Sequence, residues 1–256
     1  MSEQRKLIPG KFVWYEHVSR DAKKAQAFYG DLFGWKVEPF PMGGGATYDM
    51  IKAGEQMLGG YAAPEGGSAA HWISYACVES VDDAVKIATG IGGRLVTPAY
   101  DVPQVGRMAR IADPQGGELC VYTSFSGNDP DVADVPVGTF TWNELHTTDP
   151  KAALSFYGKV VGFTHRSMDM GPAGTYFIVG RNGIDRGGVT PHLPPGAQPH
   201  WLPYVRVENT DASLARAKKA GAKVLFGPED IAGVGRFATF EDPTGAVLAI
   251  IKPSPQ

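Results

Sequence analysis

The sequence contains very little cysteine, no long hydrophobic run and no cluster of basic residues. Only Cys77 and Cys120 occur among 256 residues, without CxxC spacing, so we expect two buried, reduced thiols rather than a disulfide. No stretch approaches the roughly 18 apolar residues that a membrane span requires. The polar start, Met1–Lys6, lacks the apolar segment of a signal peptide. These absences predict a cytoplasmic protein.

The charge pattern excludes two further classes of partner. The formal net charge is −3 at pH 7 and the sequence pI is about 6.1. Lysine and arginine are scattered singly along the chain, so we expect neither a nucleic-acid interface nor a membrane-surface site. Hydrophobic residues make up 43% and charged residues 20% of the chain, which is typical of a globular protein with a substantial core.

The clearest feature present is an internal duplication. The segment Gly10–Glu16 matches Gly138–Glu144 at an offset of 128 residues. Further matches follow in the same order along both halves. They pair Asp21 with Asp149, Phe28–Gly30 with Phe156–Gly158, Gly34 with Gly162, Gly59–Gly60 with Gly187–Gly188, His71–Trp72 with His200–Trp201, Gly106–Arg107 with Gly235–Arg236, and Asp113–Pro114 with Asp242–Pro243.

A period of about 128 residues is too long for a solenoid repeat, so each copy is expected to be a whole domain. We predict domains at 10–125 and 138–253. A linker at 126–137 joins them, within a Ser-, Gly-, Asn-, Asp- and Pro-rich stretch that shows no hydrophobic periodicity.

Each copy shows alternating strand and helix patterns. Phe12–Ser19 has the β-branched and aromatic residues of a strand, and Asp21 is a suitable N-cap for a helix over Ala22–Leu32 that Gly34 ends. Three short strands and then a second strand–helix–three-strand cycle follow. Each copy therefore contains two βαβββ units. The remaining predicted elements are strands at Lys36–Glu38, Ala46–Lys52, Gln56–Tyr61, His71–Val78, Arg94–Thr97, Gly106–Ile111 and Glu118–Thr123, and a helix at Val81–Thr89.

The segment Asp21–Trp35 resembles the opening signature of a vicinal-oxygen-chelate module, and the Asp113-Pro114-Gln115-Gly116 turn resembles its closing signature. Both recur in the second copy. The chain thus resembles the glyoxalases, extradiol dioxygenases and bleomycin-resistance proteins, and in particular two-domain glyoxalase-like proteins. The resemblance implies an α+β fold of tandem duplicated domains, each of two βαβββ units, with curved mixed β-sheets around a cavity.

Metal-dependent members of that superfamily hold a divalent ion with His, Glu or Gln side chains from the inner strand faces. The resemblance places the first ligand at Trp14 and Trp142. It places the others near Ile73 and Leu202, and at Cys120 and Ala249. Trp, Ile, Leu and Ala offer a metal no lone pair. We therefore expect the usual metal site to be absent and no cofactor to be required, although a divalent metal at shifted positions stays possible.

Strand alternation indicates which side chains share the predicted cavity face. Glu16, His71 and Glu118 share it in the first copy, together with Trp14. Glu144, His146 and His200 share it in the second, together with Trp142. His17 falls on the opposite face and is interpreted as a packing or surface residue. Trp72 and Trp201 are expected beneath the helices.

Three interpretations of these polar residues stay open. The first is a metal site built from Glu and His ligands displaced by two residues. The second is metal-free acid–base catalysis or substrate hydrogen bonding, with Glu16, Glu144, His71 and His200 as the catalytic candidates. The third is a buried Glu–His hydrogen bond that only satisfies polar groups.

Other side chains could contact a ligand directly. Trp14 and Trp142 could be platforms for an aromatic or sugar-like ligand, or core residues. Arg107 and Arg236 follow the predicted loops Tyr100–Val105 and Asp230–Val234, where a guanidinium could bind a carboxylate or form an ion pair with the partner domain. His146 and Glu118 complete the predicted substrate-binding set.

The expected function is binding of a small organic molecule in the inter-sheet cavity without the usual family metal. The alternative is a metal-dependent lyase or dioxygenase that uses the shifted Glu and His ligands. The fused duplication supplies internally the pairing that single-domain relatives gain by dimerising, so a monomer is possible.

Overall fold

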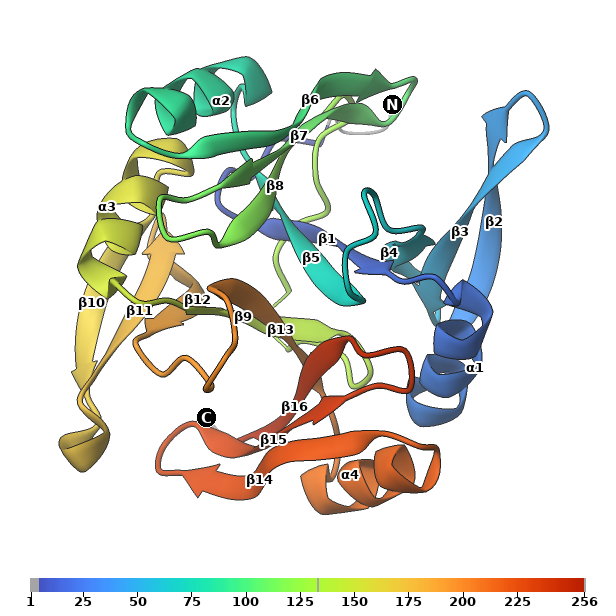
Figure 1. Ribbon diagram of the computed structural model, residues 1–256, viewed down its shortest axis with the longest axis vertical. Coiled ribbons are helices and arrows are strands. Elements are labelled where there is room, and N and C mark those ends of the chain that lie inside the picture. Colours follow the sequence, from blue (N-terminus) through green and yellow to red (C-terminus); the bar gives the residue numbers. More distant parts are fainter. Residues whose placement is uncertain (1–4, 133, 256) are drawn as a thin grey trace. The chain divides into compact units, whose positions relative to one another are not determined.

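The computed structural model describes residues 5–132 and 134–255. The first repeat contains eight strands and two helices in two βαβββ runs (Figure 1). These elements are β1 (Phe12–Val18), α1 (Ala22–Phe33), β2 (Lys36–Gly43), β3 (Ala46–Ala53), β4 (Gln56–Ala62), β5 (His71–Cys77), α2 (Val81–Gly90), β6 (Arg94–Val102), β7 (Gly106–Ala112) and β8 (Glu118–Ser124).

The second repeat has the same element order, with one short 3₁₀ turn added. Its elements are β9 (Phe140–His146), α3 (Pro150–Val160), β10 (Thr164–Asp169), η1 (Gly171–Ala173), β11 (Thr175–Arg181), β12 (Ile184–Thr190), β13 (His200–Arg206), α4 (Thr210–Lys219), β14 (Lys223–Ile231), β15 (Gly235–Glu241) and β16 (Val247–Pro253).

Each repeat contributes one eight-stranded sheet, and the two strand orders are equivalent. They are β2-β3-β4-β1-β5-β8-β7-β6 and β10-β11-β12-β9-β13-β16-β15-β14. Strand β1 is parallel to β4 and β5 to β8, whereas the hairpin pairs are antiparallel, so the sheets are mixed. The predicted α+β fold of duplicated βαβββ units with curved mixed sheets is confirmed.

The first helix of each repeat begins at the aspartate that the sequence indicates. The Asp21 side chain accepts a hydrogen bond from the backbone N–H of Lys24 at 3.0 Å, and Asp149 accepts one from Ala152 at 3.0 Å. These bonds satisfy amides that have no partner within the helix. Gly34 ends α1 in the left-handed conformation (φ 73°), which L side chains rarely adopt.

Three predicted boundaries were wrong because strands continue through irregular positions. Strand β6 extends to Val102 and β14 to Ile231, so parts of the predicted loops Tyr100–Val105 and Asp230–Val234 are paired strand. Register shifts in both hairpins interrupt the two-residue alternation on which the prediction depended. Strand β2 continues through two prolines, which an edge strand tolerates.

Backbone contacts divide the chain into two compact units that do not coincide with the repeats. Among the described residues, the first unit comprises 5–13, 74–132 and 142–201, and the second comprises 14–73, 134–141 and 202–255. Each unit therefore combines one βαβββ half from each repeat. The predicted domain limits, 10–125 and 138–253, stay a prediction.

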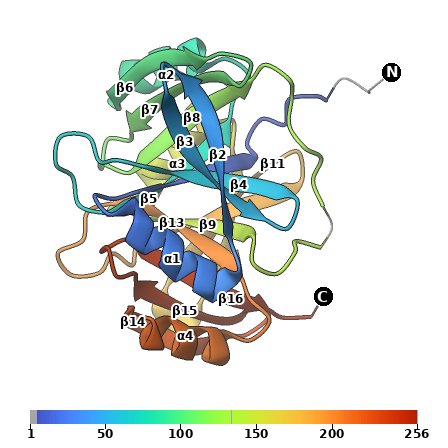
Figure 2. The same ribbon diagram turned by 90° about the vertical axis from the view of Figure 1, so that its right-hand side faces the viewer.

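Each unit has an aromatic core beneath its helices. In the second unit, Phe28 of α1 packs edge-on against Phe240 of β15. Helix α4 runs along β14–β16 (Figure 2). Trp72 and Trp201 are buried, as predicted.

Both cysteines are buried, and neither forms a disulfide within the described residues. Among the described residues, no helix is long and apolar enough to span a membrane.

Candidate functional site

The second repeat gathers five of its polar and aromatic side chains on one strand face within the first compact unit. Trp142, Glu144 and His146 alternate along β9 and are half-buried, whereas Asn143 and Leu145 between them are fully buried. This alternation follows from the pleat of the strand, which points successive side chains to opposite faces. The prediction that Trp142, Glu144 and His146 share a face is consistent with this burial pattern.

A tyrosine that the sequence analysis missed connects two of these residues. The indole Nε1–H of Trp142 donates to the hydroxyl oxygen of Tyr176 at 3.0 Å, and that hydroxyl donates to Oε2 of Glu144 at 2.8 Å. Burial, reinforced by the Glu144 charge, raises the pKa of Tyr176 well above its usual value. Tyr176 therefore stays protonated and acts as a hydrogen-bond donor to Glu144.

A glycine makes this contact possible. Gly188 of β12 is the cross-strand partner of Glu144, and a Cβ atom at Gly188 would overlap the Tyr176 ring. The absence of a side chain at this position lets the tyrosine ring lie across β12 and reach the carboxylate. The signal was in the sequence, because Tyr48 and Tyr176 are related by the same offset as Gly60 and Gly188.

His146 contacts the other oxygen of the same carboxylate. Its Nε2 lies 2.8 Å from Oε1 of Glu144 in an ion-pair contact, although the N–H bond is not aligned with the oxygen. Its Nδ1 lies 2.6 Å from the backbone carbonyl of His192, which can only accept, so Nδ1 carries a proton. Burial lowers the pKa of His146, but the bond to Glu144 and its charge outweigh burial, and the net shift is upward.

His200, at the start of β13, completes the group. Its ring is parallel to that of His146, with an interplanar angle of 3° and centroids 5.1 Å apart. Its Nδ1 donates to the carbonyl of Gln198 at 2.8 Å. Burial, with the nearby His146 charge, lowers the pKa of His200, so the ring is neutral and Nε2 carries a lone pair.

The first repeat reproduces part of this arrangement in the second compact unit. Trp14 donates to the Tyr48 hydroxyl at 3.2 Å, and Tyr48 donates to Oε1 of Glu16 at 2.8 Å. Gly60 again provides the space for the tyrosine ring. His71 donates from Nδ1 to the carbonyl of Ala69 at 2.9 Å, as His200 does to Gln198. The residue equivalent to His146 is Val18, so this strand position carries no imidazole in the first repeat.

These residues do not fit a metal ion. In the second repeat, Tyr176 and His146 contact the two oxygens of Glu144, and both nitrogens of His146 face oxygen atoms. Within residues 5–132 and 134–255, no group of three or more His, Cys, Asp or Glu side chains is arranged to hold a metal.

The predicted arginines lie in ion pairs inside their own βαβββ units. Arg107 bonds Asp82 of α2 at 2.9 Å and Asp101 of β6 at 2.8 Å. Arg236 forms the equivalent pairs with Asp211 of α4 at 2.7 Å and Asp230 of β14 at 2.8 Å. The alternative of an ion pair with the partner domain was wrong, because a helix and hairpin of the same repeat supply the carboxylates.

Glu118 also lies among basic residues, 3.6 Å from Arg110 and 3.9 Å from Arg94. The structure describes Glu118, Arg107 and Arg236 in these contacts, and their predicted role in substrate binding stays a prediction.

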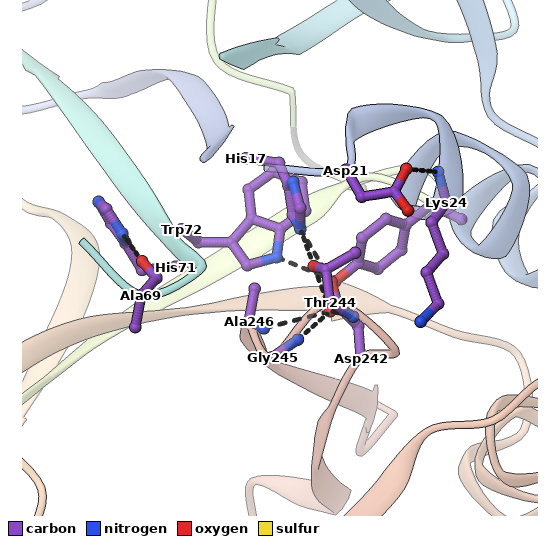
Figure 3. A network of polar contacts seen from close by, with 11 residues as sticks. His17, Asp21, Lys24, Ala69, His71, Trp72, Asp242, Thr244, Gly245 and Ala246 are labelled. Carbon is purple, nitrogen blue, oxygen red and sulfur yellow. Dashed lines mark hydrogen bonds and ion pairs between the residues drawn. The ribbon is translucent and has the colours of Figure 1, made fainter. Parts of the chain in front are cut away.

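His17 was interpreted as a packing or surface residue, and its burial against Tyr29 and Trp72 favours packing and excludes the surface alternative. His17 is fully buried, and its Nε2 lies 2.9 Å from Oδ2 of Asp242, which also accepts from the Tyr29 hydroxyl at 2.8 Å (Figure 3). Trp72 donates to the same tyrosine oxygen at 3.0 Å. Burial opposes ionisation of Asp242, but bonds from His17, Thr244 and Tyr29 outweigh it and lower the pKa of Asp242. His17 is a buried hydrogen-bonding partner of a carboxylate.

Comparison with known proteins identifies the family. A sequence profile of the glyoxalase/bleomycin resistance protein/dioxygenase superfamily matches residues 139–250, and a profile of the bleomycin resistance protein-like N-terminal region matches residues 11–48. The chain is 36% identical over 261 residues to the putative glyoxylase CFP32 of Mycobacterium bovis, covering 100% of this chain and 98% of that protein. The chain belongs to this superfamily.

Two further similarities are consistent with that membership. The anthracycline biosynthesis protein DnrV of Streptomyces peucetius is 27% identical, over 96% of this chain and 94% of its own length. The Mn(II)-bound glyoxalase from Novosphingobium aromaticivorans aligns with a TM-score of 0.65 at 19% identity, over 95% of this chain and 82% of that chain. At this identity the structural similarity shows the shared fold alone.

Proposed function

We propose that this superfamily member binds a small organic molecule against the strand faces that carry Trp142 and Trp14, without a metal at the positions its relatives use. One observation supports the proposal most. In both repeats a Trp occupies the first ligand position, and its N–H is bonded through a tyrosine to a Glu two residues further along the strand. These hydrogen bonds occupy the polar atoms of the Trp, Tyr and Glu side chains. The half-buried indole is left as a flat platform for a ligand.

The relatives support an organic ligand. DnrV and DauV are named for anthracycline biosynthesis, and CFP32 is named as a putative glyoxylase. A ring system is the part of such a molecule that a flat indole surface contacts well, because offset stacking gains area without requiring polar partners.

A second candidate is metal-free proton transfer in the second repeat alone. Nε2 of His146 lies 2.8 Å from the Glu144 carboxylate, and His200 stacks beside His146 as a neutral base. Environments that push neighbouring pKa values apart are typical of acid–base pairs. The first repeat has Val18 in place of His146, so on this hypothesis it binds without catalysing.

The test follows the indole N–H signals of ¹⁵N-tryptophan-labelled protein by NMR. Two probes are titrated separately, 2-naphthol and 2-methoxynaphthalene, and Trp142→Phe and Trp14→Phe assign the two signals. Saturable shifts of the Trp142 or Trp14 signal with either probe support the proposal. If the signals of Trp14 and Trp142 stay unchanged with both probes, the proposal is wrong.

Glu144→Gln and Glu16→Gln then separate the repeats. Each keeps the side-chain shape but removes the charge that holds Tyr176 or Tyr48. Reduced affinity in one variant assigns binding to that repeat, whereas unchanged affinity in both would reduce these carboxylates to structural residues.

A further inference from the structure

The hydrogen bonds of His200 decide which ligand group it can contact. Its Nδ1 lies 2.8 Å from the carbonyl oxygen of Gln198, and a carbonyl oxygen only accepts, so the proton of the neutral ring is on Nδ1. Nε2 then carries a lone pair. Among the described residues, Nε2 of His200 has no hydrogen-bond donor, so this acceptor remains available to a ligand.

The first repeat contains the same hydrogen bond from a histidine to a backbone carbonyl. His71 donates from Nδ1 to the carbonyl of Ala69, also two residues earlier, at 2.9 Å. The repetition indicates that the segment before β5 and β13 fixes the histidine tautomer. The two histidines differ in what lies beside them, because only His200 has a second imidazole stacked on it.

The charges beside His200 limit which chemical groups of a ligand can contact its Nε2. Glu144 and His146 are 2.8 Å apart and compensate each other, so the site offers an incoming ion no unpaired countercharge. An ammonium group approaching Nε2 of His200 would meet a carboxylate that is already paired with His146. A carboxylate or ketone oxygen has no proton to donate and would face the lone pair of Nε2.

We propose that the ligand of the second repeat presents a neutral hydroxyl group that donates a hydrogen bond to Nε2 of His200. This inference rests on the proposed function, since it names the recognition chemistry of the same strand face. His200 then selects for the hydroxyl and against the corresponding ether or carbonyl compound. A site that hydrogen-bonds a hydroxyl discriminates against an analogue that lacks it, because the buried partner would be left unpaired.

The experiment compares 2-naphthol with 2-methoxynaphthalene, which share the ring system and differ in the donor proton. In protein labelled with ¹⁵N-histidine, we expect 2-naphthol to shift the Nε2 resonance of His200 and 2-methoxynaphthalene to leave it unchanged. The loss of one hydrogen bond predicts that 2-naphthol binds roughly three- to tenfold more tightly.

His200→Phe keeps an aromatic ring but removes the acceptor, and His71→Phe is the matched control in the other repeat. We expect the preference for 2-naphthol to disappear in His200→Phe and to persist in His71→Phe. The resonance shift in the unmodified protein provides the same information if His200→Phe does not fold.

The remaining outcomes separate this inference from the proposed function. If both probes bind with equal affinity and Nε2 of His200 does not respond, the inference is wrong and the proposed function stands. If the preference depends on His71 alone, the hydroxyl site is in the first repeat and the inference is wrong. If neither probe binds, the proposed function fails, and this inference fails with it.

Discussion

The opening strands of the two repeats, β1 and β9, each contain one histidine, but at positions one residue apart. The first repeat has His17 followed by Val18, and the second has Leu145 followed by His146. Because successive strand residues point to opposite faces, moving the histidine by one position moves it from the buried face to the site face. One repeat therefore uses its histidine for the core, and the other uses it beside Glu144.

The consequence for the buried face appears in the two turn aspartates. Asp242 accepts from His17 and Tyr29 at Oδ2 and from Thr244 and backbone amides at Oδ1. Asp113 accepts backbone amides at Oδ1, and the nearby Tyr157 hydroxyl, which donates to the Gly117 carbonyl at 3.1 Å, also favours its ionised form. The buried Oδ2 of Asp113 makes no well-formed hydrogen bond among the described residues. Burial raises the pKa of Asp113 despite those amide bonds, whereas the pKa of Asp242 is lowered.

The largest expected effect comes from His17→Leu, which gives the first repeat the residue of the second. The change leaves the Asp242 carboxylate buried with one donor fewer, and breaking such a pair typically costs about 3 kcal/mol. Urea unfolding at pH 7 measures the loss. The control is His165→Leu at an exposed histidine, where we expect a change within about 0.5 kcal/mol. A loss below about 1 kcal/mol for His17→Leu would mean that the pair contributes only packing.

The next largest effect is the difference in unfolding free energy between Asp242→Asn and Asp113→Asn. Asp242 has a lowered pKa in the fold, so its stabilisation is present above the unfolded pKa of about 3.9 and is lost as the pH falls through the folded value. Asp113 has a raised pKa, so its stabilisation is present below that unfolded value and is lost as the pH rises through the folded value.

We therefore expect Asp242→Asn to cost about 2 kcal/mol at pH 7, with the difference from the unmodified protein shrinking in acid. Asparagine resembles a protonated aspartate, so Asp113→Asn should be neutral or stabilising at pH 7 and within about 1 kcal/mol of the parent. Unfolding free energies from pH 3 to pH 8 test both. Equal losses for the two variants would contradict the comparison.

An effect of about the same size is expected from Gly188→Ala and Gly60→Ala, which test the tyrosine contacts of the two sites. A methyl group would push Tyr176 or Tyr48 off the adjacent glutamate, at a cost of about 1–3 kcal/mol. Shifts of the Trp142 and Trp14 indole signals report the broken contact. Gly90→Ala in α2 is the control, because no atom lies near its added Cβ and alanine favours a helix. Unshifted indole signals in both site variants would show that the rings adapt.

The smallest expected effect concerns the stacked histidines. The charge of His146 contributes to the lowered pKa of His200, so His146→Val should raise the pKa of His200. A histidine NMR titration measures the direction, and Val18→His introduces the reciprocal change beside Glu16. A pKa of His200 that falls or stays the same in His146→Val would show that burial alone sets it.

Much of the fold could be predicted because its signals are local. The aspartate caps, the glycine at the end of α1 and the two-residue alternation of β1 and β9 each depend on nearby residues. The duplication then transferred each prediction to the other repeat. Prediction was wrong where bulges shift the register, as between Thr97 and Tyr100 in β6.

The candidate site was predicted only in part, because its contacts join distant segments. Alternation identified Glu144 and His146, but nothing local indicates that Tyr176 crosses Gly188 to reach Glu144. The same limit applies to His17, whose partner Asp242 lies 225 residues away along the chain. The repeated spacing of the tyrosine and glycine pairs was the one signal that could have revealed the first of these contacts.

The most direct test of the central claim is a titration of ¹⁵N-tryptophan-labelled protein with MnCl₂. A paramagnetic ion bound at the usual family positions would selectively broaden the indole signals of Trp14 or Trp142. The closed Trp–Tyr–Glu chains predict that one equivalent of Mn²⁺ leaves both signals intact, while 2-naphthol still shifts at least one of them. Selective loss of either signal at one equivalent would contradict the account.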